Sequence, residues 1–345
     1  MKKVYCLLFL LIAFGLLQLD AQPTGRNVSK SGTTAATFLQ IPVGARGIGM
    51  GGAFVGTADD ITSLYWNPAG SARLQNREVM FSHIDWIADA NFDYGAVGIP
   101  LADIGTIGLS FTSVTMDEML VRTVERPEGT GELFSAGSIA IGIHYARNLT
   151  DRFSIGFTGK YIHEHIWDMS AQGFALDFGT LFTTDFLNGM RIGAVITNFG
   201  TDMQLSGRNT LQYGRIDDRK QGSNERIPFH IEMEKWPLPL NFQFGVATDF
   251  IKNDVHLLTI AIDALHPSNN FQSINVGGEY GFQNLIFLRG GFHSLFLQDN
   301  EGGLTLGLGL LADLFGGNVK SRVDYAYRDF GRLREVHVFN VSVLF

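Results

Sequence analysis

Cysteine is almost absent from this chain, which has a single one, Cys6, among its 345 residues. Cys6 lies in an apolar stretch, Val4 to Leu19, that follows two lysines, and this arrangement predicts a secretory signal peptide covering residues 1–21. A chain cleaved after Ala21 retains no cysteine. Disulfides, thiol catalysis and thiolate metal sites are thereby excluded, and we expect no cofactor.

Long apolar runs are missing as well. After Leu19 no run reaches 18 apolar residues, which excludes a membrane-spanning helix. Charged residues make up only 17% of the chain, the formal net charge is −8 and no basic cluster occurs, which argues against nucleic-acid binding. An exported chain of this kind can still cross a membrane as β-strands, whose signal in a sequence is weaker.

The final segment, Glu335 to Phe345, alternates between apolar and mixed positions. Side chains alternate across a strand, so one face consists of Phe339, Val341, Val343 and Phe345. Such a face on a soluble edge strand invites aggregation, whereas a strand that closes a barrel in lipid requires it. The terminal Phe with apolar residues at every second position also resembles the C-terminal signal of bacterial outer-membrane barrels. We interpret these four residues as a barrel-assembly signal.

From Arg77 onward, apolar residues recur at every second position, as Leu304, Leu306, Leu308 and Leu310 do. Small residues occupy the positions between them, together with the charged residues Lys160, Asp177, Arg191, Asp263, Glu279, Arg289, Lys320, Arg322 and Asp324. In a soluble sandwich, glycine, alanine and serine would form a poor solvent face. In a membrane barrel the apolar face meets lipid and the small and polar face lines the interior. We therefore predict an all-β fold, a transmembrane antiparallel β-barrel of about 14 strands in the outer membrane.

The connections between the expected strands support this prediction. Every second connection is short, as residues 102–104 and 283–284 are, which is typical of periplasmic turns. Residues 116–133 and 199–238 are long, as external loops are. The strands are expected near residues 77–88, 91–100, 105–115, 134–146, 152–165, 170–183, 189–198, 239–250, 255–265, 272–282, 285–293, 302–312, 318–328 and 335–345.

A segment unlike the strands precedes the barrel. We assign residues 22–76 to a periplasmic lead and a hatch inside the barrel, and residues 77–345 to the barrel itself. Asp59 or Asp60 can cap a short helix, Ile61 to Tyr65, which must end before the following proline. The glycine run of residues 47–52 allows close backbone approach. It formally matches a dinucleotide fingerprint, but no strand leads into it and no βαβ unit surrounds it.

Three stretches of this segment, Gly44–Ala53, Ala58–Asp60 and Tyr65–Gly70, are similar to the N-terminal part of PorV/PorQ-family proteins. These proteins in turn resemble the FadL group of outer-membrane transporters. The hatch motif comprises Gly47, Gly49, Gly51, Gly52, Asp59, Asp60, Asn67, Pro68, Ala69 and Gly70. The resemblance implies a fourteen-stranded barrel with the N-terminal segment folded inside it as a hatch.

The same resemblance implies a function in type IX secretion. PorV-like proteins receive cargo through its C-terminal signal domain and pass it from the translocon to the cell surface, and PorQ-like proteins act in attachment. We therefore expect a non-enzymatic secretion component whose partners are outer-membrane lipid, the barrel-assembly machinery, the translocon and cargo. The alternative is a FadL-like, hatch-gated transporter of hydrophobic small molecules. Composition does not choose between the two.

Other candidate sites receive simpler interpretations. His163, Glu164, His165 and Asp168 could hold zinc, but a polar rim at a strand end is favoured. A hydrolase is a third option, although no Gly-x-Ser-x-Gly motif or Ser-His-Asp order supports it. Interior charges such as Lys160, Asp177 and Arg289 are instead expected to pair with the hatch. A membrane girdle is expected from the aromatic residues near strand ends, namely Trp86, Tyr94, Tyr145, Tyr161 and Trp167.

The connection 199–238 offers the best partner surface. It begins polar, becomes amphipathic and ends near a tryptophan. Loops of this length in compact folds are usually functional or disordered, and the sequence leaves both possibilities open. The candidate partner residues are Arg215, Asp217, Arg219, Phe229 and Trp236.

Overall fold

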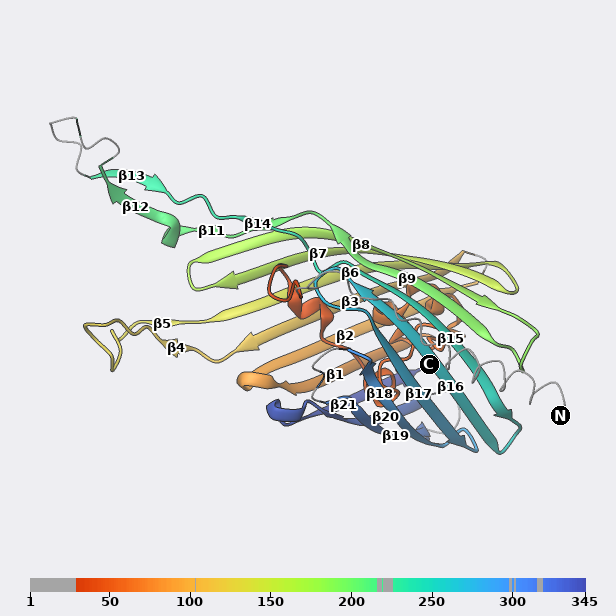
Figure 1. Ribbon diagram of the computed structural model, residues 1–345. Coiled ribbons are helices and arrows are strands. Elements are labelled where there is room, and N and C mark those ends of the chain that lie inside the picture. Colours follow the sequence, from red (N-terminus) through yellow and green to blue (C-terminus); the bar gives the residue numbers. More distant parts are fainter. Residues whose placement is uncertain are drawn as a thin grey trace, which may run out of the picture. The chain divides into compact units, whose positions relative to one another are not determined.

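The computed structural model describes residues 29–345 except 103, 216–218, 220–225, 298–299, 301 and 315–318. Residues Ser31–Phe345 form one compact unit, drawn in Figure 1. The expected signal peptide, residues 1–21, and the lead up to residue 28 lie outside the described residues. Within the described ranges, no helix has the length and apolar character needed to cross a membrane.

Fourteen antiparallel strands form a closed barrel, so the predicted fold class and strand number are confirmed. Each strand pairs with its neighbours along the chain, and β1 pairs with β21 to close the ring, with Val79 opposite Val343. The strands are β1 (Glu78–Trp86), β2 (Ala90–Leu101), β3 (Gly105–Met116), β6 (Ala136–Thr150), β7 (Phe153–Ile166), β8 (Met169–Thr183), β9 (Arg191–Gly200), β15 (Asn241–Lys252), β16 (His256–Pro267), β17 (Ser273–Phe282), β18 (Ile286–Leu295), β19 (Leu304–Leu314), β20 (Val319–Asp329) and β21 (Glu335–Leu344).

The two faces of the barrel wall differ as the alternation predicts. On β19, the four leucines from Leu304 to Leu310 are each about half exposed on the outside, whereas Thr305 between them is fully buried. In the predicted assembly signal, Phe339, Val341 and Phe345 are likewise exposed at 47–56%. A closed ring pairs the strand backbone within the protein, and its apolar outer surface is suited to lipid.

The aromatic girdle was predicted only in part. Tyr145 and Trp167 are exposed on the outer surface, at 39% and 40%. Tyr94 is 2% exposed and belongs to the interior core, and Trp86 packs against that core and against Phe330. Both were therefore assigned to the wrong face, because interior aromatic residues pack on the hatch and look like outward ones in sequence.

The long connections contain structure of their own. In the first, β4 (Met119–Leu120) pairs with β5 (Leu133–Phe134). In the second, short ribbons extend beyond the barrel, as Figure 1 shows. Its elements are β10 (Met203–Gln204) paired with β14 (Lys235–Trp236), β11 (Ser206–Gly207) paired with β8, the 3₁₀ helix η4 (Arg208–Thr210), and β12 (Leu211–Gly214) paired with β13 (Ile227–His230). The 3₁₀ helices η3 (Ile87–Asp89) and η5 (Gly331–Leu333) lie in shorter connections at the same end.

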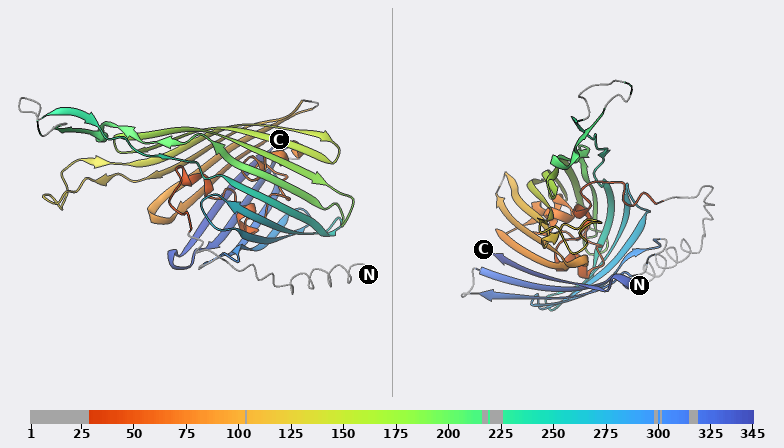
Figure 2. Two further views of the ribbon diagram at one scale, coloured as in Figure 1. Left: turned by 45° about the horizontal axis from the view of Figure 1, so that its top comes forward. Right: turned by 90° about the vertical axis from the view of Figure 1, so that its left-hand side faces the viewer.

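The hatch fills the ring of strands, as the view along the barrel in Figure 2 shows. It consists of η1 (Thr37–Gln40), α2 (Ala45–Gly49), α3 (Ser63–Trp66) and η2 (Pro68–Arg73). Helix α3 is the predicted short helix, begun two residues later. The Asp60 carboxylate accepts a hydrogen bond from the Thr62 backbone N–H (2.9 Å) just before it. Pro68 starts η2 after the helix ends. Helix α2 was not predicted.

The hatch runs through the barrel from the long-loop end to the short-turn end. The Ala35 N–H donates to the Pro237 carbonyl (2.9 Å), which lies in the long second connection. Arg73 instead donates to the Thr183 hydroxyl (2.6 Å), at the end of β8 that the short turns occupy. The described start of the hatch therefore meets the barrel at the long-loop end. The periplasmic position of the lead stays a prediction for the residues that precede it.

Inward-facing glycines let the hatch backbone lie directly on the wall. A Cβ atom at Gly277 would come within 2.1 Å of the Met50 carbonyl oxygen, and one at Gly156 within 2.3 Å of the Pro68 carbonyl carbon. Similar backbone contacts occur at Gly193 and Gly291, and Gly179 lies against the side chains of Asn67 and Pro68. The small residues that alternate with apolar ones in the sequence thus form the seat of the hatch.

We predict that Gly156→Ala destabilises the protein by about 1–3 kcal/mol, the usual cost of overpacking, because backbone atoms of the hatch cannot yield easily. Gly159→Ala on the same strand is the control, since its Cβ would have only the tip of Leu176 within 4 Å. The midpoint of heat unfolding in detergent measures the difference. Equal midpoints for both variants would contradict the tight seat.

Candidate functional site

Arg46 of α2 is the centre of a buried ion-pair network. Its Nε and Nη2 donate to the two carboxylate oxygens of Glu279, at 2.8 and 2.7 Å. Its Nη1 donates to Asp60 (2.8 Å) and also contacts Asp59. Because Glu279 lies on β17, this bidentate pair joins the hatch to the barrel wall.

Wall residues extend the network. Arg289 donates to Glu279 (2.6 Å) and to Asp324 (2.7 Å), and Arg322 lies 3.5 Å from Asp60. Three guanidinium groups thus face four carboxylates, those of Asp59, Asp60, Glu279 and Asp324. Opposite charges at such distances offset much of the cost of burying each of them.

The expectation that Lys160, Asp177 and Arg289 pair with the hatch is wrong, because all three form their ion pairs with residues of the wall. Lys160 and Asp177 pair with each other within the wall, at 2.7 Å. Arg289 is linked to the hatch indirectly, through Glu279, which it shares with Arg46.

The network shifts the ionisation of the hatch groups. Burial alone would raise the pKa of the Asp60 carboxyl, but Arg46 and Arg322 outweigh it and lower that pKa below its usual value. Burial would likewise lower the pKa of Arg46, and the carboxylates of Asp59, Glu279 and Asp60 outweigh it and raise the pKa. Both groups therefore stay charged at neutral pH.

Further contacts hold the hatch backbone. The Asp263 carboxylate accepts from the N–H groups of Phe54 (2.8 Å) and Val55 (2.9 Å), and Glu78 accepts from Ile61 (2.9 Å). The Asn67 amide donates to the Thr180 carbonyl of β8 (3.1 Å). The sequence analysis placed Asp263 inside the barrel without assigning its partners, and it did not identify Glu78.

The structure brings the hatch motif together. Asn67 accepts from the Ala69 N–H (3.2 Å), and Gly70 lies against the Ala58 carbonyl, where a Cβ would approach to 2.3 Å. The φ angles of Gly51 and Gly52 are +66° and +77°, a conformation that disfavours other residues. Gly47 lies under the Trp66 ring and Gly49 against Gly307. The motif residues thus determine the local conformation of the hatch.

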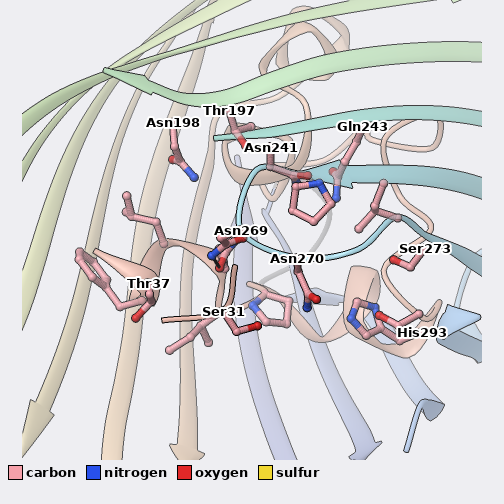
Figure 3. Close-up of a pocket in the computed structure, with 18 of the residues that line it drawn as sticks. Ser31, Thr37, Thr197, Asn198, Asn241, Gln243, Asn269, Asn270, Ser273 and His293 are labelled. Atoms are coloured by element: carbon pink, nitrogen blue, oxygen red, sulfur yellow. Dashed lines mark hydrogen bonds between the residues drawn. The ribbon is translucent and has the colours of Figure 1, made fainter. Parts of the chain in front are cut away.

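A cavity of about 700 Å³ opens at the long-loop end, above the hatch. One side is formed by residues 37–42 and by Tyr65 and Trp66 of the hatch, and the other by the barrel wall (Figure 3). Besides apolar side chains, the wall side and the adjoining β16–β17 connection carry the ring of His293 and the amide and hydroxyl groups of Thr197, Asn198, Asn241, Gln243, Asn269, Asn270, Ser273, Asn275 and Ser294. Sequence reasoning missed this site, although Asn and Gln on inward-facing positions were a signal for it.

The candidate metal cluster has another use. Glu164 accepts from the Ala36 N–H (3.1 Å) and from the Ser138 hydroxyl (3.4 Å), and so ties the start of the hatch to β7. The rings of His163 and His165 stack with their centroids 6.3 Å apart. Over the described ranges, no three His, Cys, Asp or Glu side chains are grouped to hold a metal ion.

One serine–histidine pair does occur in the interior. Ser110 lies 2.8 Å from His144 Nε2, and Thr158 lies 2.7 Å from Nδ1 of the same ring. His144 is 1% exposed, and the cavity beside Ser110 measures about 20 Å³. This volume holds about one water molecule, so an ester substrate has no room there.

The candidate partner residues lie on the ribbons beyond the barrel. Phe229 and Trp236 are exposed, at 42% and 40%. Trp236 pairs with Met203 between β14 and β10. Arg215 and Arg219 lie in the connection between β12 and β13, and Asp217 falls outside the described residues.

Comparison with known proteins supports the fold. A family model described as an uncharacterised protein family (UPF0164) matches residues 18–131, and no curated protein matches the chain. The toluene transporter TbuX of Ralstonia pickettii is similar in structure, with a TM-score of 0.53, 13% identity, and coverage of 88% of this chain and 97% of TbuX. A FadL homologue of Pseudomonas aeruginosa has a TM-score of 0.52 and 10% identity, and the match covers 88% of this chain and 98% of the homologue. The CymD monoaromatic hydrocarbon channel has a TM-score of 0.51 and 12% identity, and the match covers 88% of this chain and 97% of CymD.

The chain therefore has the fold of these FadL-type barrels, and its closed β-barrel assigns it to the outer membrane. TbuX is named as a toluene transporter and CymD as a monoaromatic hydrocarbon channel. At such low identity the likeness establishes the fold.

The lowered pKa of Asp60 predicts a response to acid. A carboxyl whose pKa is lower in the folded state contributes stability above its ordinary pKa, and this contribution is lost as the pH falls through the folded value. We expect the midpoint temperature of unfolding to decrease when the pH is lowered below about 4. Asp60→Asn should unfold at lower temperature at pH 7 and show a smaller acid response. The control is Asp85→Asn, whose carboxylate is 83% exposed. An acid response in Asp60→Asn as large as in the wild type would contradict this assignment.

Proposed function

We propose that this chain is a hatch-gated transporter that carries small molecules with an apolar portion across the outer membrane without chemical change. The observation that carries the proposal is the cavity of about 700 Å³ at the long-loop end, hereafter the mouth cavity, whose floor is the hatch itself. Its volume of about 700 Å³ lies within the range of small-molecule sites. A molecule bound there contacts the element that blocks its passage.

The cavity is suited to amphiphilic molecules rather than to pure hydrocarbons. Trp66, Trp86 and Phe330 supply aromatic surface, and the amides of β9, β15 and β17 supply hydrogen-bonding groups. The transporters and channels that share this fold are named for toluene and monoaromatic hydrocarbons, which supports an aromatic or otherwise apolar portion in the ligand.

Passage requires the hatch to move. Below the mouth, two cavities against the hatch measure about 20 and 10 Å³. Each holds about one water molecule at most. The seat glycines and the Arg46–Glu279 pair hold the surrounding backbone in place, so transport depends on local release of the hatch rather than on a standing pore.

A disulfide between hatch and wall tests this requirement. Gly108 of β3 faces Leu64 of α3, and a Cβ on it would meet the leucine methyl groups at 2.9 and 3.0 Å. We expect oxidised Leu64→Cys/Gly108→Cys to stop entry of radiolabelled benzoate into proteoliposomes at pH 8, and reduction to restore it. The only native cysteine, Cys6, lies in the expected signal peptide, so no other thiol interferes.

The matched control joins two wall strands. Thr112 of β3 and Ala140 of β6 are register partners on the inner face. Oxidised Thr112→Cys/Ala140→Cys should carry benzoate at the wild-type rate. If the hatch-to-wall disulfide forms and benzoate still enters at that rate, hatch gating is wrong.

A second candidate function is the PorV/PorQ-type role in type IX secretion, with the translocon and cargo C-terminal domains as partners. The ribbon of β12 and β13 favours it, because Tyr213 and Phe229 are exposed there at 65% and 42%, far from the barrel wall. Exposed aromatic side chains are common anchors of protein interfaces. The terminal Phe345 remains a proposed contact of the barrel-assembly machinery.

Removing the ribbon separates the two candidates. The Ile231 N–H bonds the Thr210 carbonyl (2.9 Å), so residues 211–230 can be replaced by two glycines without displacing the flanking chain. We expect this deletion to leave benzoate entry unchanged. Loss of secreted cargo from the surface of cells carrying the deletion, with benzoate entry intact, would favour the secretion role.

A further inference from the structure

The charged side chains that line the mouth cavity are Lys160, Glu164 and Arg328, and only one of them lacks a polar partner. Lys160 pairs with Asp177 (2.7 Å). Glu164 accepts the Ala36 N–H and the Ser138 hydroxyl. These two side chains are occupied in holding the wall and the hatch.

Arg328, near the outer end of β20, has no such partner. Its guanidinium lies over the Phe330 ring, 4.4 Å from the centroid. Within the described part of the chain, no carboxylate lies within 4.0 Å of it, and its buried Nε has no hydrogen-bond partner. A largely buried cation without an anion is costly, and the ring contact offsets only part of that cost. The position is therefore suited to an anionic ligand.

Acceptor atoms lie in the same cavity. His293, which also lines a small cavity with Arg328 and Trp66, has its Nδ1 3.2 Å from the Gly51 carbonyl oxygen. A carbonyl only accepts, so Nδ1 carries the hydrogen and Nε2 of the neutral ring remains an acceptor. Across the cavity, Asn241 Oδ1 is buried without a hydrogen-bond donor. Figure 3 shows Asn241 and Gln243 next to each other on β15, facing the cavity.

We propose that Arg328 binds the carboxylate of a small hydroxylated organic acid, whose hydroxyl groups hydrogen-bond His293, Asn241 and Gln243. The inference rests on the proposed transport function and names the substrate class of its cavity, and the apolar portion of such an acid is the C–H face of its carbon ring, which can lie against Trp66 and Trp86. A pure hydrocarbon would leave Arg328 and Asn241 unpaired, and an alkyl or aryl acid would satisfy Arg328 alone. A guanidinium and a carboxylate can form two parallel hydrogen bonds, which fixes the orientation of the ligand.

Titration of the purified full-length protein in detergent tests the proposal, with tryptophan fluorescence as the readout because Trp66 and Trp86 line the cavity. The probes are galacturonate, galactose and benzoate. These carry both the carboxylate and the hydroxyls, the hydroxyls alone, and the carboxylate alone. We expect galacturonate to bind at least about tenfold more tightly than either of the others, since each lacks one set of partners.

Arg328→Gln should weaken galacturonate binding at least about tenfold and leave galactose unchanged, while Arg328→Lys should recover part of the loss. Lys235→Gln is the control, because it removes an exposed cation at the same end of the barrel. Wild-type unfolding midpoints for all variants exclude misfolding as the cause. Equal binding of galacturonate by the wild type and Arg328→Gln, or a preference for benzoate over galacturonate, would overturn the assignment.

Failure of this inference is distinguishable from failure of the transport proposal. Hatch-dependent benzoate entry without galacturonate binding would reject the hydroxylated acid and keep the transporter. The opposite outcome is also possible: galacturonate binding depends on Arg328, but oxidation of the Leu64→Cys/Gly108→Cys pair changes the entry rate of neither benzoate nor galacturonate. That result would reject hatch gating and keep the binding site.

Discussion

In a bilayer, each backbone polar group of a strand must find its partner within the protein, and this constraint determines the rest of the molecule. It requires the sheet to close, which β1 and β21 accomplish. Eight strands already give an interior that side chains can fill, and fourteen leave more space than that. The N-terminal segment occupies the space, and its backbone reaches the wall because glycines such as Gly156 and Gly277 leave room for it.

The two ends of the interior differ in how their buried charges are paired. Around Arg46, charges on the hatch and the wall compensate one another at short distances. Buried ion pairs contribute little net stability, yet loss of one partner is strongly destabilising, so the network specifies where the hatch sits. At the mouth, Arg328 and Asn241 keep unpaired groups. The Arg46 network is therefore compensated in charge, although Nη2 of Arg289 and Nη2 of Arg322 are also buried without hydrogen-bond partners, whereas the Arg328 cation at the mouth has no carboxylate beside it among the described residues.

The period of two in the sequence was enough to predict the wall, because lipid on one side and a packed plug on the other impose it on every strand. It could not place Tyr94, since an aromatic residue that packs on the hatch has the same composition signal as one in the membrane interface. Helix α2 was also beyond prediction. It has five residues, two of them glycine, and glycine disfavours helices, so contact with β18 to β21 must maintain it. The mouth cavity is lined by residues 37–42 and by residues between 241 and 297, and a local sequence pattern cannot predict that two such distant segments lie together.

The seam between β1 and β21 has a consequence for biogenesis. The hatch precedes β1 in the chain, and the pairing of β1 with β21 closes the ring, so the barrel encloses a segment that lies before all of its strands. Backbone atoms of the hatch lie within van der Waals contact of the wall around the circumference, which leaves no way to thread it into a finished cylinder. The sheet must therefore close around the hatch, and the backbone hydrogen bonds between Phe345 and Arg77 complete a barrel whose interior is already packed.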